Sequence, residues 1–365
     1  MGLDTVAFIE DHYIHERGLP SEKTVDYLRA NYLNLGKLGK KSLKGGFYPP
    51  AEPKSDNPEP KIIVLDLGLG QPLKGKLAAD VYTSGRILEV SLDGKNVRTL
   101  LENEALPDGI DAHKQSGRIF WTTMGIPSKN DGTVRSANLD GTDVKTIVPA
   151  ENIHTPKQLV VDQASSKLYI SDREGLRVWR CNTDGSALEV LIQNGDWQDQ
   201  AVQSDSLNWC VGITVAPKYG KFFWTQKGPS KSGKGRIFSA NIETPAGQTS
   251  ATRSDIETVA SGLPECIDLD VNEETNTLYW TDRGEVPLGN SLYRAKLDNA
   301  GGVASKPEII AQNFNETIGL KVDAKNDSIY VTDLGGSIWK CRLDGTGKKR
   351  LYEEEAATFS GITLV

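Results

Sequence analysis

Short apolar runs, separated by glycine, proline, asparagine and aspartate, follow one another along most of the chain. Runs of this length between such residues are typical of β-strands joined by tight turns. Only the first 45 residues differ, because their apolar side chains recur at helical spacing. They predict two short amphipathic helices, one carrying Val6, Ile9 and Tyr13 and one carrying Val25, Leu28, Tyr32 and Leu35.

From about residue 61 the chain repeats. One recurring element is an apolar strand that often ends near aspartate, and it occurs six times at intervals of 42 to 54 residues. Its copies begin at Gly109, Gln158, Gly212, Cys266, Gly319 and Gly361. Each of the first five is followed by an aromatic strand, as in Leu278-Tyr279-Trp280-Thr281-Asp282. A third strand then leads into a turn, which in three repeats is Asp-Gly and suits a hairpin.

The two ends of the repeat region complement each other. The sixth apolar strand, Gly361 to Val365, has no aromatic strand after it. The segment from Leu77 to Leu101 supplies strands that lack a preceding apolar one, beginning with Val81-Tyr82-Thr83. We expect the last strand to pair with this segment, because a ring closed in this way leaves no open sheet edge. The sequence therefore predicts an all-β, six-bladed β-propeller over residues 61–365, preceded by a helical arm and linker over residues 1–60.

The motif Tyr279-Trp280-Thr281-Asp282, with variants at Tyr169, Phe223 and Tyr330 and with Leu-Asp-Gly turns, resembles the YWTD propeller repeat of lipoprotein-receptor ectodomains. The resemblance covers roughly residues 76–365. It implies the fold but not the function, since propellers have many functions. The chain departs from the receptor pattern because it lacks cysteine-rich modules and has longer loops.

Composition and charge indicate which classes of protein and which cellular locations the sequence favours. The net charge is −7, and the few basic clusters suit solvated loops better than a nucleic-acid surface. There is no apolar stretch long enough for a membrane span and no secretory signal at Met1, so we expect a cytoplasmic location. The four cysteines are scattered and predict reduced, buried thiols, and neither they nor the four histidines have zinc-site spacing.

In a propeller, the loops before each inner strand and after each second strand surround one mouth of the central channel. Long loops on a rigid scaffold usually carry binding sites. Reading off these positions gives two expected groups. The catalytic candidates are Asp108, Lys157, Glu265 and Arg283, and the substrate-binding candidates are Met124, His154, Trp197, Trp209, Thr317 and Phe359. Aromatic walls with mixed charges suit a mostly apolar ligand with one polar end.

Less specific interpretations of these residues stay open. Asp108 and Glu265 are also expected as ordinary surface carboxylates, and His154 as an exposed loop residue. Trp197 and Trp209 are equally compatible with loop packing. Asp172, Asp282 and Asp333 belong to the repeat, so we interpret them as structural anchors of turns.

A stand-alone YWTD propeller with a helical arm and long loops is similar to fungal propeller enzymes of secondary metabolism, including the hetero-Diels–Alderases of tropolonic sesquiterpene pathways. This resemblance implies small-molecule aromatic and terpene substrates. A hydroxymethyl aromatic or tropolone would lose water to give an o-quinone methide, which a terpene alkene then captures. Glu265 or Asp108 would serve as the acid and Arg283 or Lys157 as the cation, and neither a metal nor an organic cofactor is required.

Two other functions compete with this one. A propeller face can bind a protein or peptide without catalysis, and an acidic face would prefer basic partners. Other six-bladed propellers are metal-dependent lactonases, although the lysine and aromatic residues expected at the mouth disfavour that interpretation. The helical arm is expected either to cap the ring or to bridge two copies of the chain in a homodimer.

Overall fold

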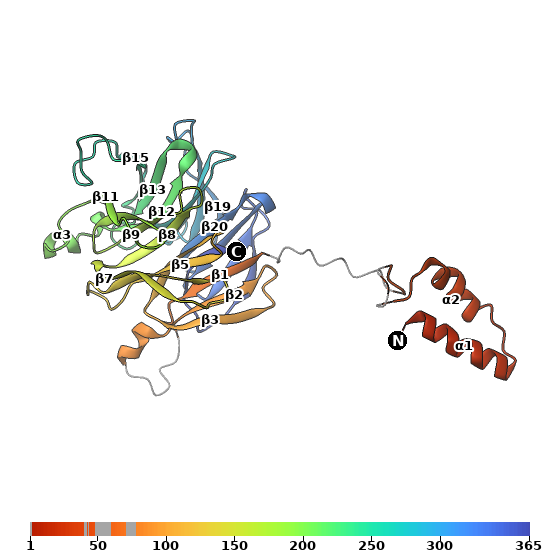
Figure 1. Ribbon diagram of the computed structural model, residues 1–365. Coiled ribbons are helices and arrows are strands. Elements are labelled where there is room, and N and C mark those ends of the chain that lie inside the picture. Colours follow the sequence, from red (N-terminus) through yellow and green to blue (C-terminus); the bar gives the residue numbers. More distant parts are fainter. Residues whose placement is uncertain (1, 40–41, 43, 48–59, 71–77) are drawn as a thin grey trace. The chain divides into compact units, whose positions relative to one another are not determined.

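The computed structural model describes residues 2–39, 42, 44–47, 60–70 and 78–365 of the chain. They divide into two compact units, Met1–Glu59 and Pro60–Val365. The second unit is a six-bladed β-propeller (Figure 1). Its described strands form six four-stranded antiparallel sheets, one for each blade.

Each blade has one strand at the channel, two middle strands and one outer strand. The inner strands are β4 (Pro107–His113), β8 (Pro156–Asp162), β12 (Cys210–Ala216), β16 (Cys266–Asn272), β20 (Thr317–Asp323) and β24 (Phe359–Leu364). The second strands are β5 (Arg118–Thr123), β9 (Lys167–Asp172), β13 (Lys221–Gln226), β17 (Thr277–Asp282), β21 (Ser328–Asp333) and β1 (Lys61–Asp66). The third strands are β6 (Gly132–Asn138), β10 (Arg177–Asn182), β14 (Gly235–Asn241), β18 (Ser291–Lys296), β22 (Ser337–Cys341) and β2 (Gly85–Ser91). The outer strands are β7 (Lys145–Ile153), β11 (Glu189–Gln193), β15 (Glu257–Leu263), β19 (Glu308–Gln312), β23 (Lys349–Glu353) and β3 (Val97–Glu104).

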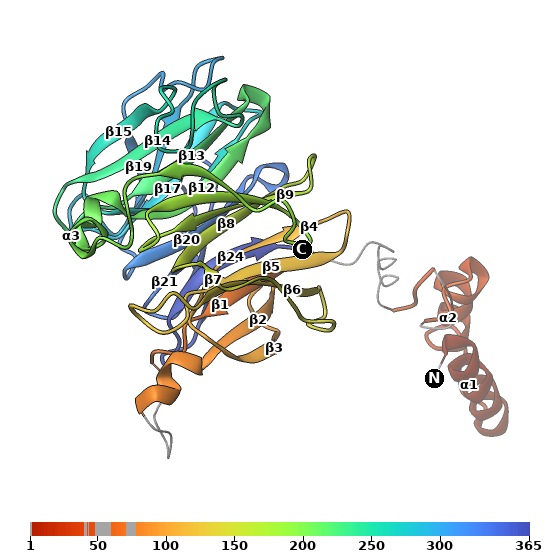
Figure 2. The ribbon, with the colours of Figure 1, turned by 60° about the vertical axis from the view of Figure 1, so that its left-hand side comes forward.

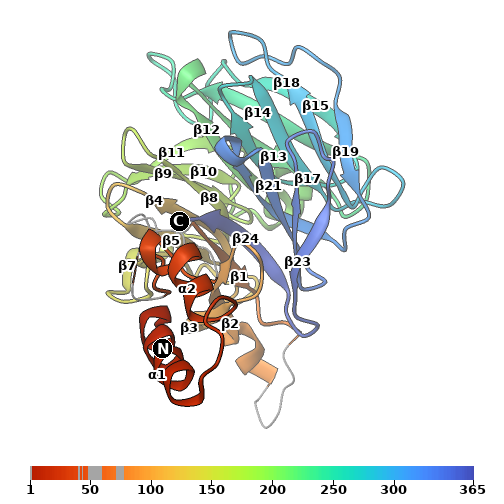
Figure 3. The same ribbon diagram turned by 90° about the vertical axis from the view of Figure 1, so that its right-hand side faces the viewer.

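The ring is closed by its last strand, as the sequence predicts, but through a different partner. β24 pairs with β1, where Ile362 lies opposite Val64, and the two strands run side by side in Figures 2 and 3. The expected strand Val81-Tyr82-Thr83 is wrong, since these residues end the 3₁₀ helix η2 (Ala78–Thr83) outside the sheet. β1 already occupies the place of the second strand, and the long connection between β1 and β2 conceals this order in the sequence.

The repeat residues hold neighbouring blades together. Thr225 Oγ1 accepts a hydrogen bond from the Gly212 amide within its blade at 2.7 Å and donates one to the Ile267 carbonyl of the next blade at 2.6 Å. Equivalent threonine bridges start from Thr122, Thr281 and Thr332. The largest buried side chains include Trp121, Trp224 and Trp280, each of which belongs to a hydrophobic cluster shared by two neighbouring blades. Blade packing therefore depends on the same motif that identifies the repeat.

The repeat aspartates are structural, which confirms the expectation. Asp172 accepts hydrogen bonds from the amides of His154 and Thr155 in the loop that leads into its own blade. Asp282 likewise accepts hydrogen bonds from the backbone amides of Glu265 and Gly284. Because each carboxylate joins the end of a second strand to the loop before the first strand, it fixes the loops around one end of the channel.

In the N-terminal unit, α1 (Leu3–Arg17) and α2 (Val25–Asn31) are followed by the 3₁₀ helix η1 (Leu33–Leu35). The two predicted helices are thus confirmed. The contact between them uses Ala7, Val25 and Leu28, with Val6 and Ile14 beside them. Ile9 and Tyr13 were expected on the packed face but are exposed. The reason is that α1 carries apolar residues on more than one side, so spacing alone does not identify its buried face.

Candidate functional site

One opening of the channel lies where the inner strands begin, and we name it the upper mouth. It holds a small cavity of about 50 Å³. Its lining consists of Asp108, Lys157, Arg173, Val211, Lys227, Ile267, Arg283 and Ile318. Four of these eight side chains are cations, and three are aliphatic. An anionic group with an apolar body is the ligand type that suits such a lining.

A shared backbone feature places the lining. All six inner strands change register immediately after their first residue, as between Cys210 and Ile213 in β12 and between Cys266 and Leu269 in β16. In five of these six strands the second residue then faces the channel, whereas Ser360 of β24 is buried and donates to the Pro107 carbonyl. Asp108, Lys157, Val211, Ile267 and Ile318 all hold this second position. Arg173, Lys227 and Arg283 each follow the last residue of a second strand, the position from which the sequence predicts Arg283 at the mouth.

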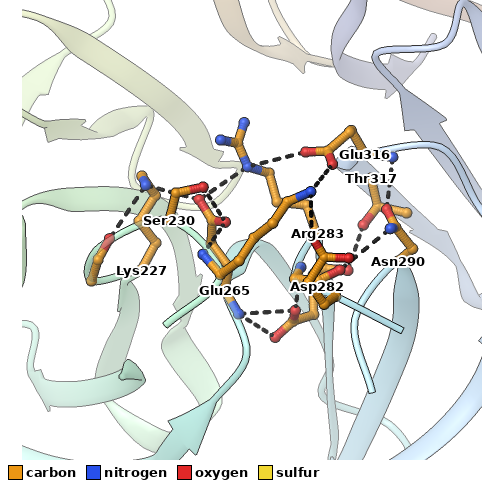
Figure 4. A network of polar contacts seen from close by, with 12 residues as sticks. Lys227, Ser230, Glu265, Asp282, Arg283, Asn290, Glu316 and Thr317 are labelled. Atoms are coloured by element: carbon orange, nitrogen blue, oxygen red, sulfur yellow. Dashed lines mark hydrogen bonds and ion pairs between the residues drawn. The ribbon is translucent and has the colours of Figure 1, made fainter. Parts of the chain in front are cut away.

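Glu265 lies at the centre of a polar network at this mouth (Figure 4). Its carboxylate accepts hydrogen bonds from Lys227 Nζ at 2.8 Å and from Arg283 Nε at 3.0 Å. The Lys231 amide and the Ser230 hydroxyl also donate to it, at 2.9 and 3.2 Å. Glu265 is completely buried, so the expectation of an ordinary surface carboxylate is wrong.

The surroundings of Glu265 determine its protonation. Burial alone would raise its pKa, but the hydrogen bond from Lys227 and the charges of Arg283 and Lys227 outweigh burial and lower the pKa. The residue is therefore a carboxylate at neutral pH, a form that accepts protons and holds cations.

Asp108 and Lys157 form a second buried pair. Lys157 Nζ donates to Asp108 Oδ1 at 2.8 Å and lies 3.0 Å from the sulfur of Met124. Gln158 Nε2 also donates to Asp108, at 3.2 Å. Burial lowers the pKa of Lys157, although the charge of Asp108 opposes this change. An ammonium group with a lowered pKa is a stronger acid than an exposed lysine, so Lys157 is better suited to donate a proton than Glu265.

Trp209 lies at the edge of the mouth. Its ring is 5.1 Å from the Arg173 guanidinium and 5.8 Å from Lys227 Nζ. Its indole nitrogen donates to the Gln203 carbonyl at 2.7 Å, which ties it to the loop containing α3 (Gln200–Ser204) and η3 (Ser206–Asn208). Since Lys227 contacts both Trp209 and Glu265, these two residues lie on the same side of the ring.

His154 and Trp197 form a separate cluster beside this loop. Their rings pack edge to face with centroids 5.3 Å apart. The His154 ring also contacts the Thr155 hydroxyl at 2.8 Å and the Gln203 amide at 3.2 Å. Burial lowers the pKa of His154, and the side chain is not exposed as expected of a loop residue. Neither residue belongs to the lining of the upper mouth.

Thr317 and Phe359 do not reach the mouth either. The Thr317 hydroxyl donates to the Asp282 carbonyl at 2.8 Å, and Phe359 is completely buried in a hydrophobic core with Val64 and Tyr330. Both are first residues of inner strands and precede the register change, so their side chains point into the structure. The expectation that Phe359 forms a pocket wall is wrong for this reason.

Val211, Ile267 and Ile318 are lining residues that the sequence reading missed. A signal for them was available, because Gly212 and Gly319 align with Gly109 and Gly361 in the repeat. The residue before each of these glycines holds the second strand position. When the inner strands are aligned on these glycines, the residue at the second position of each strand is identified as a candidate lining residue.

The four cysteines are free and buried, as predicted. Burial raises the pKa of every one of these thiols, which makes them poor nucleophiles. Within the described part of the chain, no three histidine, cysteine, aspartate or glutamate side chains are grouped to hold a metal ion. No described helix is long and apolar enough to cross a membrane.

Comparison with known proteins gives two close sequence relatives. The 3-hydroxyacyl-CoA dehydrogenase-like protein LAM1 of Cochliobolus heterostrophus is 47% identical over 372 residues, covering 100% of this chain and 77% of LAM1. The low-density lipoprotein receptor-related protein 1 of Pyricularia oryzae is 38% identical, covering 85% of this chain and 100% of that protein. No protein-family model matches the chain.

Among solved structures, a chain of the nidogen/laminin complex superimposes with a TM-score of 0.62. The superposition covers 84% of this chain and 98% of that chain at 15% sequence identity. At this identity the similarity establishes the fold alone.

Proposed function

Because this chain belongs to the family of fungal propeller proteins that includes LAM1 and the Pyricularia oryzae receptor-related protein, we propose that it is a small-molecule enzyme that acts at the upper mouth. It dehydrates a hydroxymethyl aromatic or tropolone to an o-quinone methide and guides the hetero-Diels–Alder reaction of this product with a terpene alkene.

The observation that carries the proposal is the convergence of four cations over an aliphatic floor. Lys157, Arg173, Lys227 and Arg283 line the mouth together with Val211, Ile267 and Ile318. Among the described carboxylates paired with these cations, Asp108 lines the cavity, whereas Glu174, Glu265 and Glu316 do not. The ring oxygens of a tropolone would lie against the cations. Because the cavity holds only about 50 Å³, this polar end of the ligand alone would enter it. The hydrocarbon part would extend over Trp209.

The residues suit the dehydration step. The ring hydroxyl releases its proton to solvent, the exocyclic C–O bond breaks, and the hydroxyl leaves as water after taking up a proton from Lys157, which solvent then reprotonates. The ring retains the electron pair as a carbonyl conjugated to the new methylene, so nothing is oxidised or reduced. Lys157 donates the proton to the leaving hydroxyl, and Asp108 stabilises the protonated lysine. Lys227 and Arg283 hold the ring oxygens, with Glu265 as the carboxylate that positions both.

The names of the relatives are not a sufficient guide to the reaction. A dehydrogenase that uses a dinucleotide is usually built on a parallel sheet with crossover helices. All the described strand pairs of this propeller that build a blade are antiparallel, as in β12–β13 and β16–β17. The dehydrogenase-like description of LAM1 therefore does not decide the substrate of this chain.

The test is to incubate the purified protein with a hydroxymethyl tropolone and humulene and to measure the adduct by mass spectrometry. The adduct has the summed mass of both substrates less one water. We expect Lys157→Met and Arg283→Met to lower the rate at least tenfold. Lys95→Met is the matched control, because Lys95 lies in the exposed turn between β2 and β3.

Rates equal to the buffer reaction would contradict the proposed enzyme. Titration of tropolone by calorimetry separates the alternatives further. A protein that only binds peptides would give no heat with tropolone, and a lactonase would lose activity with a chelator.

A further inference from the structure

The opposite opening of the channel holds a much larger cavity, of about 510 Å³. It lies where the inner strands end and turn into the second strands, and we name it the lower cavity. Its volume is within the range of sites for small organic ligands. None of the residues proposed above for the reaction lines it.

The floor of the lower cavity is formed by the fifth residues of the inner strands. Lys321 Nζ lies 3.0 Å from Asp111 Oδ1, which also accepts the Thr363 hydroxyl at 2.8 Å. Asp270 is different, because its two oxygens accept only the Val271 and Val322 amides, at 2.9 and 3.0 Å. Among the described residues no cation forms an ion pair with Asp270. The floor thus holds two carboxylates but one lysine, and that lysine pairs with Asp111.

The walls and the rim differ in character. Aliphatic side chains from three inner strands form the walls, namely Val215, Val271 and Val322, and Val160 adds an apolar side chain to the floor. The lining as a whole contains six carboxylates and three lysines, so its charge is negative. Glu273 and Glu274 contribute to this excess at the rim. The upper mouth has the reverse balance, since cations predominate in its lining.

We propose that the lower cavity binds a small organic cation, with its ammonium group at Asp270 and Asp111 and its hydrocarbon part against the valine walls. The floor supplies the carboxylate without an ion-pair partner that such a group requires, and the aliphatic walls supply the apolar contact. A bare metal ion would leave most of this volume unused and would gain nothing from the apolar walls.

Calorimetry with the full chain tests the proposal, with benzylamine as the probe and benzyl alcohol as its uncharged counterpart. We expect benzylamine to bind at least tenfold more tightly than benzyl alcohol. Asp270→Asn should weaken benzylamine binding at least tenfold, and Glu274→Gln should weaken it two- to threefold. Glu274 lies at the rim, so its variant keeps the test decisive if Asp270→Asn does not fold. Asp93→Asn, in the exposed β2–β3 turn, should change nothing.

Equal affinity for the amine and the alcohol would overturn the proposal, and so would benzylamine binding that survives both Asp270→Asn and Glu274→Gln. Absence of binding at millimolar benzylamine would overturn it as well. Calcium chloride that binds more tightly and displaces benzylamine would show a metal site instead. None of these results depends on the reaction at the upper mouth.

Discussion

Lys227 Nζ lies 2.8 Å from Glu265 Oε1, although the two residues are 38 positions apart and belong to neighbouring blades. The lysine follows β13 and the glutamate precedes β16. Their side chains are 10% and 0% exposed, so the pair spans the blade boundary in a largely dry environment. The pair connects the stability of the ring to the charge of the upper mouth.

Removing one partner of this pair should destabilise the propeller. In Lys227→Met, Glu265 keeps Arg283 but loses its shorter ion pair. We expect the free energy of unfolding to fall by about 2 to 3 kcal/mol, toward the lower end for a broken buried pair because Arg283 remains. Urea unfolding followed by circular dichroism measures this change. Lys95→Met, which removes an exposed pair, is the control, and an equal loss in both variants would contradict the buried role of Lys227.

Gly109→Ala should also destabilise the ring. A Cβ atom at Gly109 would lie 2.5 Å from the Gln158 Cα and from the Lys157 carbonyl oxygen in the next blade. Backbone atoms cannot move aside cheaply, so we expect a loss of about 1 to 3 kcal/mol, as for other overpacked sites. Gly117→Asn is the matched control, since Gly117 has a φ of 62° that asparagine tolerates and no neighbour within 4 Å. Thermal unfolding of both variants gives the comparison.

Removing residues 359–365 should prevent the propeller from closing. β24 is the inner strand of its blade, and its Ser360 hydroxyl donates to the Pro107 carbonyl of the next blade at 2.9 Å. Its loss would expose the edge of β1, and exposed edges promote aggregation. We expect the truncated chain to elute as aggregates in size-exclusion chromatography. Deletion of residues 1–59, which form the other compact unit, should leave the unfolding midpoint unchanged. A monomeric truncated chain with an unchanged midpoint would refute the closure by β24.

Asp268 should make the stability of the protein depend on pH. Burial raises its pKa to about 8, and the charge of Lys321 and the amides of Leu320 and Leu269 only partly oppose this. The unfolded chain ionises near the ordinary value for aspartate, so the folded state binds the extra proton between about pH 4 and 8. Stability is then fully present below this window and is lost as the pH rises through it, by an amount on the order of a few kcal/mol.

Asp268→Asn removes this ionisation. The variant should therefore gain stability relative to the wild type between pH 5 and pH 9, as measured by urea unfolding at both values. Asp323→Asn, in the lining of the lower cavity, should not show such a gain. A difference between wild type and Asp268→Asn that is the same at both pH values would contradict the raised pKa.

Some features of the site followed from the sequence and others did not. The position of Lys227 and Arg283 after the second strands is visible in the repeat, because the Asp-containing motif marks where each strand ends. The burial of Glu265 is not visible, since Lys227, Ser230 and Lys231 reach it from the loop after β13, in another blade. The lower cavity was not predicted, because the long loops that were used to locate the site lie at the other end of the channel.

The sequence by itself determined the number of blades, the order of the strands in five of them and the role of the last strand in closing the ring. Those features depend on the local pattern of apolar and polar residues and on a motif that recurs at regular intervals, and both can be read directly from the sequence. Tertiary structure decided which side chains face the channel, because a register change of the inner strands, which pattern alone does not reveal, reverses the direction of each side chain. It also decided that β1, rather than the segment at Tyr82, completes the last blade, since strand pairing depends on contacts between residues about 300 positions apart.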